Sequence, residues 1–194
     1  MASKELQFFI LTGEPGVGKT TLIKKLSSAI GSKGVEVQGF YTEEVRKNGF
    51  REGFDVVTLD GKRGRLARQQ NLLNSSVKYK VGKYGVLIDE FENIALPSLE
   101  KRTSDNGNYL LVIDEIGKME FFSEPFKSVM RNIFAQKSLA TVLATIPLKS
   151  SDRFIESLKN DTRAKVWMVT KENRNNIQET ILNEMYTKLF DAPL

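Results

Sequence analysis

Short apolar runs alternate along the chain with segments whose apolar positions have helical spacing. The run at residues 6–12 predicts a buried parallel strand, and a glycine-rich turn follows it. Residues 20–30 then place apolar side chains on one face of a helix that Gly31 is expected to end. This part of the chain is therefore predicted to form a strand, a glycine-rich turn and a helix, in that order.

The section that follows has the pattern of an antiparallel sheet. Its expected strands are residues 35–42, 50–59, 77–81 and 85–88. Residues 47–49 (Lys-Asn-Gly) predict a hairpin turn between the first two strands, and residues 60–61 (Asp-Gly) predict a second turn. Residues 63–76 are polar and irregular, so a mobile loop is expected there.

Strands and helices alternate through the rest of the sequence. Strands are expected at residues 109–113, 139–146 and 165–169, and helices at residues 91–96, 123–134, 152–159 and 173–190. Pro97 is expected to end the first of these helices, and residues 104–108 have the composition of a loop. The alternation predicts an α/β fold in three layers, with a mainly parallel sheet between helices and the antiparallel section added to it.

The composition limits both the architecture and the chemistry. The chain has 194 residues, 40% of them hydrophobic and 27% charged, so we expect one domain over residues 1–194. It contains no cysteine and no histidine, which excludes disulfides, thiolate metal sites and Ser-His-Asp catalysis. Carboxylates, lysine, arginine and magnesium are left to do any chemistry.

The net charge of +5 comes from basic residues spread along the chain. Such a surface suits an anionic ligand, but we expect most of it to be ordinary solvated surface and predict no stable nucleic-acid partner. The sequence shows neither a signal peptide nor a stretch as long as a membrane span. We therefore expect a soluble intracellular protein, in the cytoplasm and without a membrane partner, and a monomer.

Residues 13–20 fit the phosphate-binding loop G-x-x-x-x-G-K-[ST], and they lie between a predicted strand and a predicted helix, as that motif requires. Its glycines let backbone N–H groups point towards phosphate oxygens, and the helix N-terminus adds a favourable field. Lys19 is expected to contact the outer phosphates, and Thr20 to offer its hydroxyl to magnesium. The predicted nucleotide-binding residues of this segment are Gly13, Glu14, Pro15, Gly16, Val17, Gly18, Lys19, Thr20 and Thr21.

The apolar strand that starts near Tyr109 ends in two adjacent carboxylates and has the form of a Walker B segment. Asp114 is expected to hold magnesium through water, and Glu115 to orient or deprotonate an attacking water. Glu115 would thus turn nucleotide binding into hydrolysis. The predicted nucleotide-binding residues of this segment are Leu111, Val112, Ile113, Asp114, Glu115, Ile116, Gly117 and Lys118.

Other polar residues near these motifs have two interpretations each. Thr145 ends the next apolar run, where it would sense the terminal phosphate or cap the turn that follows. Arg46 and Arg51 bracket the hairpin tip, where they would supply charge to the transition state or simply be exposed. Lys118 and Glu120 follow the second motif and belong to the same catalytic edge or to ordinary surface.

Longer segments resemble the small P-loop nucleoside-triphosphatases of thermophilic prokaryotes and vertebrates over nearly the whole chain. The resemblance is carried by residues 12–21 (TGEPGVGKTT), 39–46 (GFYTEEVR), 53–59 (GFDVVTL), 112–120 (VIDEIGKME), 145–147 (TIP) and 170–174 (TKENR). Residues 68–76 depart from the family in composition and length.

The resemblance implies a fold related to the RecA and AAA-type proteins. It also implies magnesium-dependent hydrolysis of ATP, GTP, CTP and UTP to the diphosphate and phosphate, with low base selectivity. Asn173 and Arg174 follow the last strand, where they are candidate contacts to the base or ribose. Alternatively, Asn173 caps the helix that follows.

A nucleotide or nucleoside kinase is the main alternative, because it would share the phosphate loop and replace water with a second substrate. The adjacent Asp114 and Glu115 favour water, and the middle section lacks a clear arginine-rich lid. A GTP-dependent switch is less expected, because residues 170–173 are not the Asn-Lys-x-Asp sequence that reads guanine. A nucleotide-gated nucleic-acid-binding module would use the basic surface, but no aromatic-rich basic strand is visible.

Overall fold

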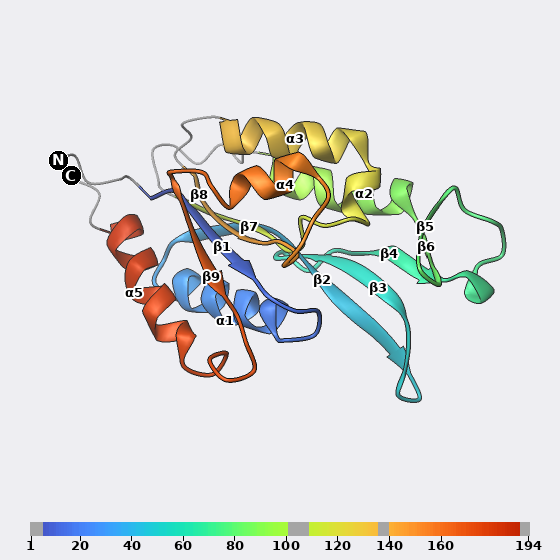
Figure 1. Ribbon diagram of the computed structural model, residues 1–194, viewed down its shortest axis with the longest axis horizontal. Coiled ribbons are helices and arrows are strands. Elements are labelled where there is room, and N and C mark those ends of the chain that lie inside the picture. The colour runs from blue at the N-terminus through green and yellow to red at the C-terminus, as the bar shows by residue number, and fades with distance from the viewer. Residues whose placement is uncertain (1–5, 101–108, 136–139, 191–194) are drawn as a thin grey trace.

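The computed structural model describes residues 6–100, 109–135 and 140–190. One nine-stranded sheet runs through these residues in the order β5-β6-β4-β3-β2-β7-β8-β1-β9 (Figure 1). Its parallel half contains β1 (Phe8–Thr12), β2 (Glu36–Lys47), β7 (Tyr109–Ile113), β8 (Ala140–Thr145) and β9 (Ala164–Met168). Every residue of β1 and β8 is buried, which explains why these strands are continuous apolar runs in the sequence.

β2 also begins an antiparallel half of the sheet. It pairs with β3 (Phe50–Thr58), and the sheet continues through β4 (Arg63–Gln69), β6 (Tyr84–Val86) and β5 (Tyr79–Val81). The β2–β3 hairpin projects beyond the body of the molecule (Figure 1). Asn48 and Gly49 form its turn with φ angles of 51° and 81°, the backbone that the Asn-Gly pair predicts.

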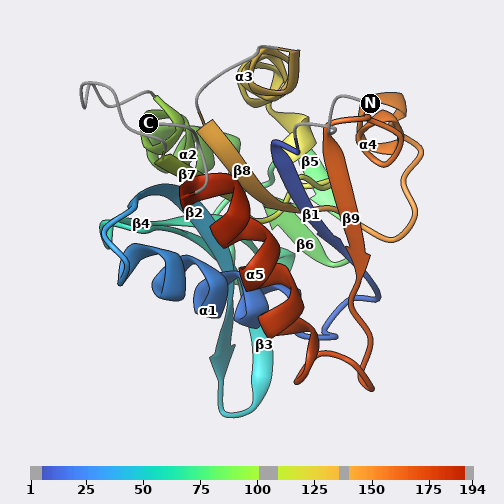
Figure 2. The same ribbon diagram turned by 90° about the vertical axis from the view of Figure 1, so that its left-hand side faces the viewer.

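Helices cover both faces of the sheet (Figure 1, Figure 2). One face carries α1 (Lys19–Gly31) and α5 (Ile177–Phe190), and the other carries α2 (Ile88–Leu99), α3 (Glu124–Ala135) and α4 (Arg153–Leu158). Two short 3-10 helices, η1 (Gln70–Leu72) and η2 (Glu120–Phe122), complete the described elements. Each face has its own apolar core, so the three predicted layers are present. Within the described ranges, no helix combines the length and apolar character needed to cross a membrane.

The register of the parallel strands brings several strand ends to one edge of the sheet. Leu11 at the end of β1 pairs with Thr145 at the end of β8, and Ile113 at the end of β7 pairs with Ala144. The segments that leave β1, β7 and β8 therefore begin side by side. In open α/β sheets, this carboxyl edge is where ligands bind.

The prediction of a mobile loop at residues 63–76 is wrong over its first half, which forms β4. Phe54 of β3 pairs with Ala67 while its neighbour Asp55 pairs with Arg65, so Leu66 is an extra residue in the ladder. This β-bulge buries both Leu66 and Ala67. The alternation of apolar and polar residues that identifies a strand is lost at that point.

Two helices differ from their predicted ends. α2 begins at Ile88 and continues through Pro97, whose missing N–H removes one hydrogen bond, and ends two residues later at Leu99. α5 begins at Ile177, four residues later than predicted, because Asn173 belongs to a turn instead. The predicted loop at residues 104–108 and the first residue of the strand predicted at 139–146 lie outside the described residues.

Candidate active site

The predicted phosphate loop connects β1 to α1 at the carboxyl edge of the sheet. Gly18, directly before α1, has a φ of 113°, which side-chain-bearing residues rarely adopt. Lys19 follows as the first residue of the helix and is buried. Its Nζ donates hydrogen bonds to the carbonyl oxygens of Gly13 (2.9 Å) and Glu14 (3.2 Å). The loop therefore curls around its own lysine, and the helix N-terminus faces the same side.

The segment after β9 lies against this loop. A Cβ on Gly13 would be 2.3 Å from the carbonyl oxygen of Val169, so only glycine fits there. The guanidinium of Arg174 donates a hydrogen bond to the carbonyl oxygen of Val17 (3.3 Å), and its Cδ would be 3.7 Å from a Cβ on Gly18. The structure therefore brings Arg174 to the phosphate loop, and its contact with the base or ribose stays a prediction.

Unlike Arg174, Asn173 bonds to the backbone of its own turn. Its Oδ1 accepts a hydrogen bond from the Thr170 N–H (2.8 Å), and its Nδ2 donates to the carbonyl oxygen of Met168 (2.8 Å). These bonds fix the turn between β9 and α5. The alternative prediction that Asn173 caps α5 is wrong, because its side-chain oxygen bonds a backbone group that precedes it in the chain.

Asp114 is the centre of a buried hydrogen-bond cluster at the end of β7. It is 1% exposed, and its Oδ1 accepts a hydrogen bond from the Thr145 hydroxyl (2.5 Å). Its Oδ2 accepts from the backbone N–H of Thr42 (3.4 Å), and the nearby Thr20 hydroxyl also favours the charged form of the carboxyl group. Burial raises the pKa of Asp114, while these hydrogen bonds act in the opposite direction.

Thr145 and Thr42 make contacts to Asp114 that the sequence does not predict. The Thr145 hydroxyl holds the Asp114 carboxyl group, and its contact with the terminal phosphate stays a prediction. Thr42 was not predicted as a site residue, because its contribution is a backbone N–H that any residue carries. Only the pairing of β2 with β7 brings that group to the site.

Two further carboxyl groups follow Asp114. Burial and the nearby Asp114 raise the pKa of Glu115. Glu120 in η2 is 4% exposed, and burial together with Glu115 raises its pKa well above the ordinary value. The buried Asp114 and Glu120 and the half-buried Glu115 therefore lie close together. The charge of Lys19 acts against the rise in the pKa of Asp114 and Glu115.

The donor set fits a divalent cation that is shared with a bound phosphate group. Thr20 and Asp114 present a hydroxyl and a carboxylate that lie near each other. No cluster of three or more metal-binding side chains occurs in the described part of the chain. One or two oxygen ligands are what magnesium takes from a protein when water and phosphates supply the rest.

The remaining predicted residues fall into three groups. Leu111, Val112, Ile113 and Ile116 have their side chains in the apolar cores, so they support the strand and cannot reach a nucleotide through those side chains. Gly117 is buried under the acids. The exposed residues of the set are Glu14, Pro15, Gly16, Thr21 and Lys118.

Arg46 and Arg51 lie on the projecting hairpin, where the structure brings both guanidinium groups to Glu44. Arg46 Nε donates to a Glu44 carboxyl oxygen at 2.9 Å, and Arg51 forms an ion pair with the other oxygen. Arg46 also bonds the carbonyl oxygen of Gly49 in the turn (3.1 Å). Both arginines stabilise the hairpin in this structure.

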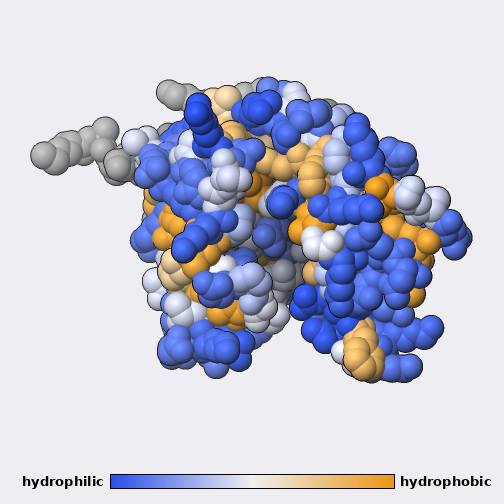
Figure 3. Space-filling view, turned by 45° about the vertical axis from the view of Figure 1, so that its right-hand side comes forward, coloured by the Kyte–Doolittle hydropathy of each residue, from blue (hydrophilic) through white to orange (hydrophobic). Residues whose placement is uncertain are grey.

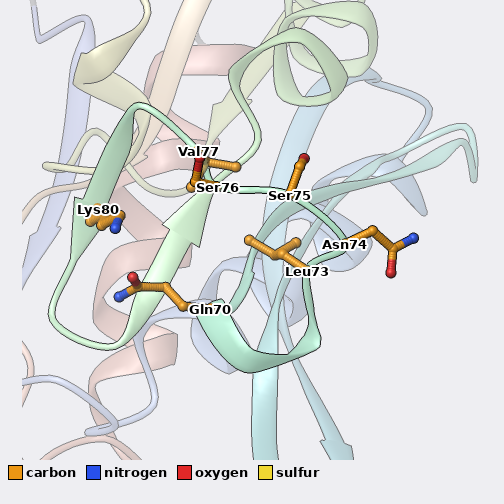
Figure 4. A pocket seen from close by; sticks show the side chains of 7 residues that line it. All are labelled: Gln70, Leu73, Asn74, Ser75, Ser76, Val77 and Lys80. Carbon is orange, nitrogen blue, oxygen red and sulfur yellow. The ribbon is translucent and has the colours of Figure 1, made fainter.

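The surface is hollowed at the edge that carries these residues. Figure 3 shows the hollow between two lobes at the lower edge of the molecule. The hairpin and the loop before α5 lie at the same edge in Figure 1. Two other surface cavities, of about 320 and 390 Å³, lie beside β5, β6 and the start of α2. Figure 4 shows the first, lined by Gln70, Leu73 and Lys80 among others. The residues that line these two cavities include none of the predicted site residues.

A three-layer α/β fold, a phosphate loop between β1 and α1 and a paired acidic motif after β7 define a P-loop nucleotide-binding protein. Consistent with this class, a family model described as NTPase matches residues 8–182. The chain belongs to this NTPase family, as its resemblance predicted.

The chain is also similar to proteins whose names state an activity. The chain is 44% identical over 180 residues to the cancer-related nucleoside-triphosphatase homolog of Bos taurus, covering 90% of this chain and 94% of that protein. It is also 44% identical over 174 residues to nucleoside-triphosphatase THEP1 of Thermotoga sp. (strain RQ2), covering 90% and 92%. The crystal structure of THEP1 from Aquifex aeolicus matches with a TM-score of 0.80 and 37% identity, covering 91% and 98%. The predicted fold class and the predicted enzyme class, a hydrolase acting on nucleoside triphosphates, are confirmed.

Proposed function

We propose that the protein is a magnesium-dependent phosphohydrolase that converts ATP, GTP, CTP and UTP to the diphosphate and phosphate with little regard for the base. The observation that carries the proposal is the cluster around Asp114, which joins Thr20 of the phosphate loop to Thr145 of β8 and places Glu115 next in the chain. A phosphate-binding loop, a metal-binding pair and a base are thereby assembled at one edge of the sheet.

Each group has a part in the reaction. Backbone N–H groups of residues 13–18 and the ammonium of Lys19 bind and neutralise the outer phosphates. A magnesium ion held by Thr20 and Asp114 would neutralise charge on the terminal phosphates. Glu115 orients a water molecule and accepts its proton as the water oxygen bonds to the terminal phosphorus. The bond from that phosphorus to the bridging oxygen breaks, and the diphosphate leaves with the electron pair.

The proposed low base selectivity is supported by two side chains on the segment after β9, those of Asn173 and Arg174. Both side-chain atoms of Asn173 that could read a base are already bonded to backbone groups of its own turn. We infer that Arg174, which lies against Val17 and Gly18, contacts the ribose or the phosphates that all nucleotides share. The site therefore recognises the triphosphate.

The basic residues support a function without nucleic acid. Several form ion pairs across strands or with helices, among them Lys24 with Glu43, Arg65 with Glu90 and Lys165 with Glu184. Paired cations contribute less to phosphate binding than a free basic stripe would. We accordingly propose that its partners are nucleoside triphosphates. A monomer stays a prediction.

The test is phosphate release from each of the four triphosphates with magnesium and no acceptor substrate. We expect release from all four, and a loss of at least about a hundredfold in kcat in Glu115→Gln, because general base catalysis contributes that much. Glu124→Gln is the matched control, since that side chain is 74% exposed. Phosphate transfer only to an added nucleotide acceptor would instead identify a kinase.

A further inference from the structure

Glu120 is a buried acid that the proposed reaction does not use. A Cβ on Gly117 would be 3.0 Å from Oε2 of Glu120 and 3.1 Å from Oε1 of Glu115. The two carboxyl groups thus converge on one small residue, and their oxygens are no more than about 6 Å apart. A Cβ at this position would require these carboxyl groups to shift by a few tenths of an ångström.

The Glu120 carboxyl group also closes the turn that carries Glu115. Its Oε2 lies against Gly117, and the backbone N–H groups of Gly117 and of Glu120 itself favour its charged form. The N–H of Phe121 donates to the Gly117 carbonyl oxygen (3.0 Å) from the other side of the turn. Gly117 is therefore held within the turn, two residues after Glu115, by the Phe121 N–H at its carbonyl oxygen and by the Glu120 carboxyl group packed against it.

An acid in this place is unfavourable for stability alone. Glu120 is almost completely buried, and burial and its neighbour Glu115 both disfavour its charged form. An apolar side chain would fill the same buried space without that cost. The contacts that an apolar residue cannot make are those to the Gly117 backbone and towards Glu115.

We propose that Glu120 is a positioning residue for Glu115: its carboxyl group fixes the Gly117 turn and so holds Glu115 where it orients the attacking water. This inference rests on the proposed function, in which Glu115 acts on water. It adds a residue to the reaction that touches neither substrate nor metal and acts only through its neighbour.

The test compares Glu120→Met and Glu120→Gln in the full chain, each made alone and together with Glu115→Gln. Met fills the space without hydrogen-bonding to the turn, whereas Gln keeps an acceptor for the Gly117 N–H. We expect Glu120→Met to lower kcat by about tenfold or more with KM within about twofold, because the lost interaction orients a reacting group. Glu120→Gln is expected to retain most of kcat.

The double variants separate positioning from structure. If Glu120 acts only through Glu115, then the double variant has the same kcat as Glu115→Gln alone. Losses that multiply, a large rise in KM, or an unchanged kcat in a folded Glu120→Met protein would overturn the positioning role alone. Full turnover by the single variant Glu115→Gln would overturn the proposed use of Glu115 and the positioning role with it. Should Glu120→Met fail to fold, Glu120→Asp, whose shorter side chain reaches less far, gives the same expected loss and the same cycle.

Discussion

Thr145 donates a hydrogen bond from its hydroxyl to Oδ1 of Asp114 over 2.5 Å, from the strand next to the one that Asp114 follows. Both side chains are almost fully buried. A hydroxyl in this position sets the direction in which the carboxylate presents its other oxygen. β8 thus takes part in the site through its hydrogen bond to Asp114.

Replacing Thr145 by Val keeps the shape of the side chain and removes this hydrogen bond. We expect the magnesium concentration that gives half-maximal hydrolysis to rise by about tenfold or more, because the carboxylate loses its orientation. Thr145→Ser restores the hydroxyl and is expected to recover most of the affinity. An unchanged magnesium dependence in Thr145→Val would show that the bond does not orient Asp114 for metal.

The close approach of Gly13 to the backbone of Val169 leads to a second prediction. In Gly13→Ala the new methyl group would meet a backbone oxygen at 2.3 Å, so the phosphate loop has to move. We expect kcat/KM to fall by about a hundredfold, since small displacements of positioning groups are this costly. Gly34→Ala is the control, because its φ is also positive but nothing lies within 4 Å. It should lose stability and keep its kcat/KM.

Local chemistry explains which parts of the fold and site could be predicted from the sequence. Gly13 to Thr20 and the pair Asp114 and Glu115 are contiguous motifs, and their meaning depends on the strand and helix beside them. The buried strands around them are continuous apolar runs. These features were predicted at the positions where the structure has them.

The rest depends on contacts between distant segments. The bulge at Leu66 breaks the alternation of apolar and polar residues in β4. The arginines of this polar strand pair with acids on other elements, and the sequence does not indicate those partners. Asn173 was a candidate for base contacts, and its amide is occupied by backbone groups that only the folded turn brings near. Polar residues have several possible partners, and the fold decides among them.

Asp55 of β3 gives a prediction about stability. Its carboxyl oxygens bond Arg68 (2.5 Å) and Arg63 (2.8 Å) of β4, and its side chain is only 9% exposed. Asp55→Ala leaves the largely buried Arg68 guanidinium without its counterion, so we expect a loss on the order of 2–3 kcal/mol in the free energy of unfolding. Urea unfolding followed by circular dichroism measures it. Glu90→Ala, which breaks the exposed pair with Arg65, should cost less than about 1 kcal/mol, and equal losses would contradict the difference in burial.

Glu120 also makes stability depend on pH. Its pKa in the folded protein is raised well above the 4.5 of an ordinary glutamate, because of burial and then Glu115. The folded state therefore binds this proton more tightly than the unfolded chain, and the stability linked to it is complete below about pH 4.5 and is lost as pH rises through the raised pKa. Glu120→Gln keeps the neutral form at every pH, so the variant should gain stability over the parent as pH increases from 5 to 8. The measurement is urea unfolding of both proteins across this range, with Glu124→Gln as the exposed control. A difference between variant and parent that does not change with pH would show that Glu120 keeps an ordinary pKa in the folded protein.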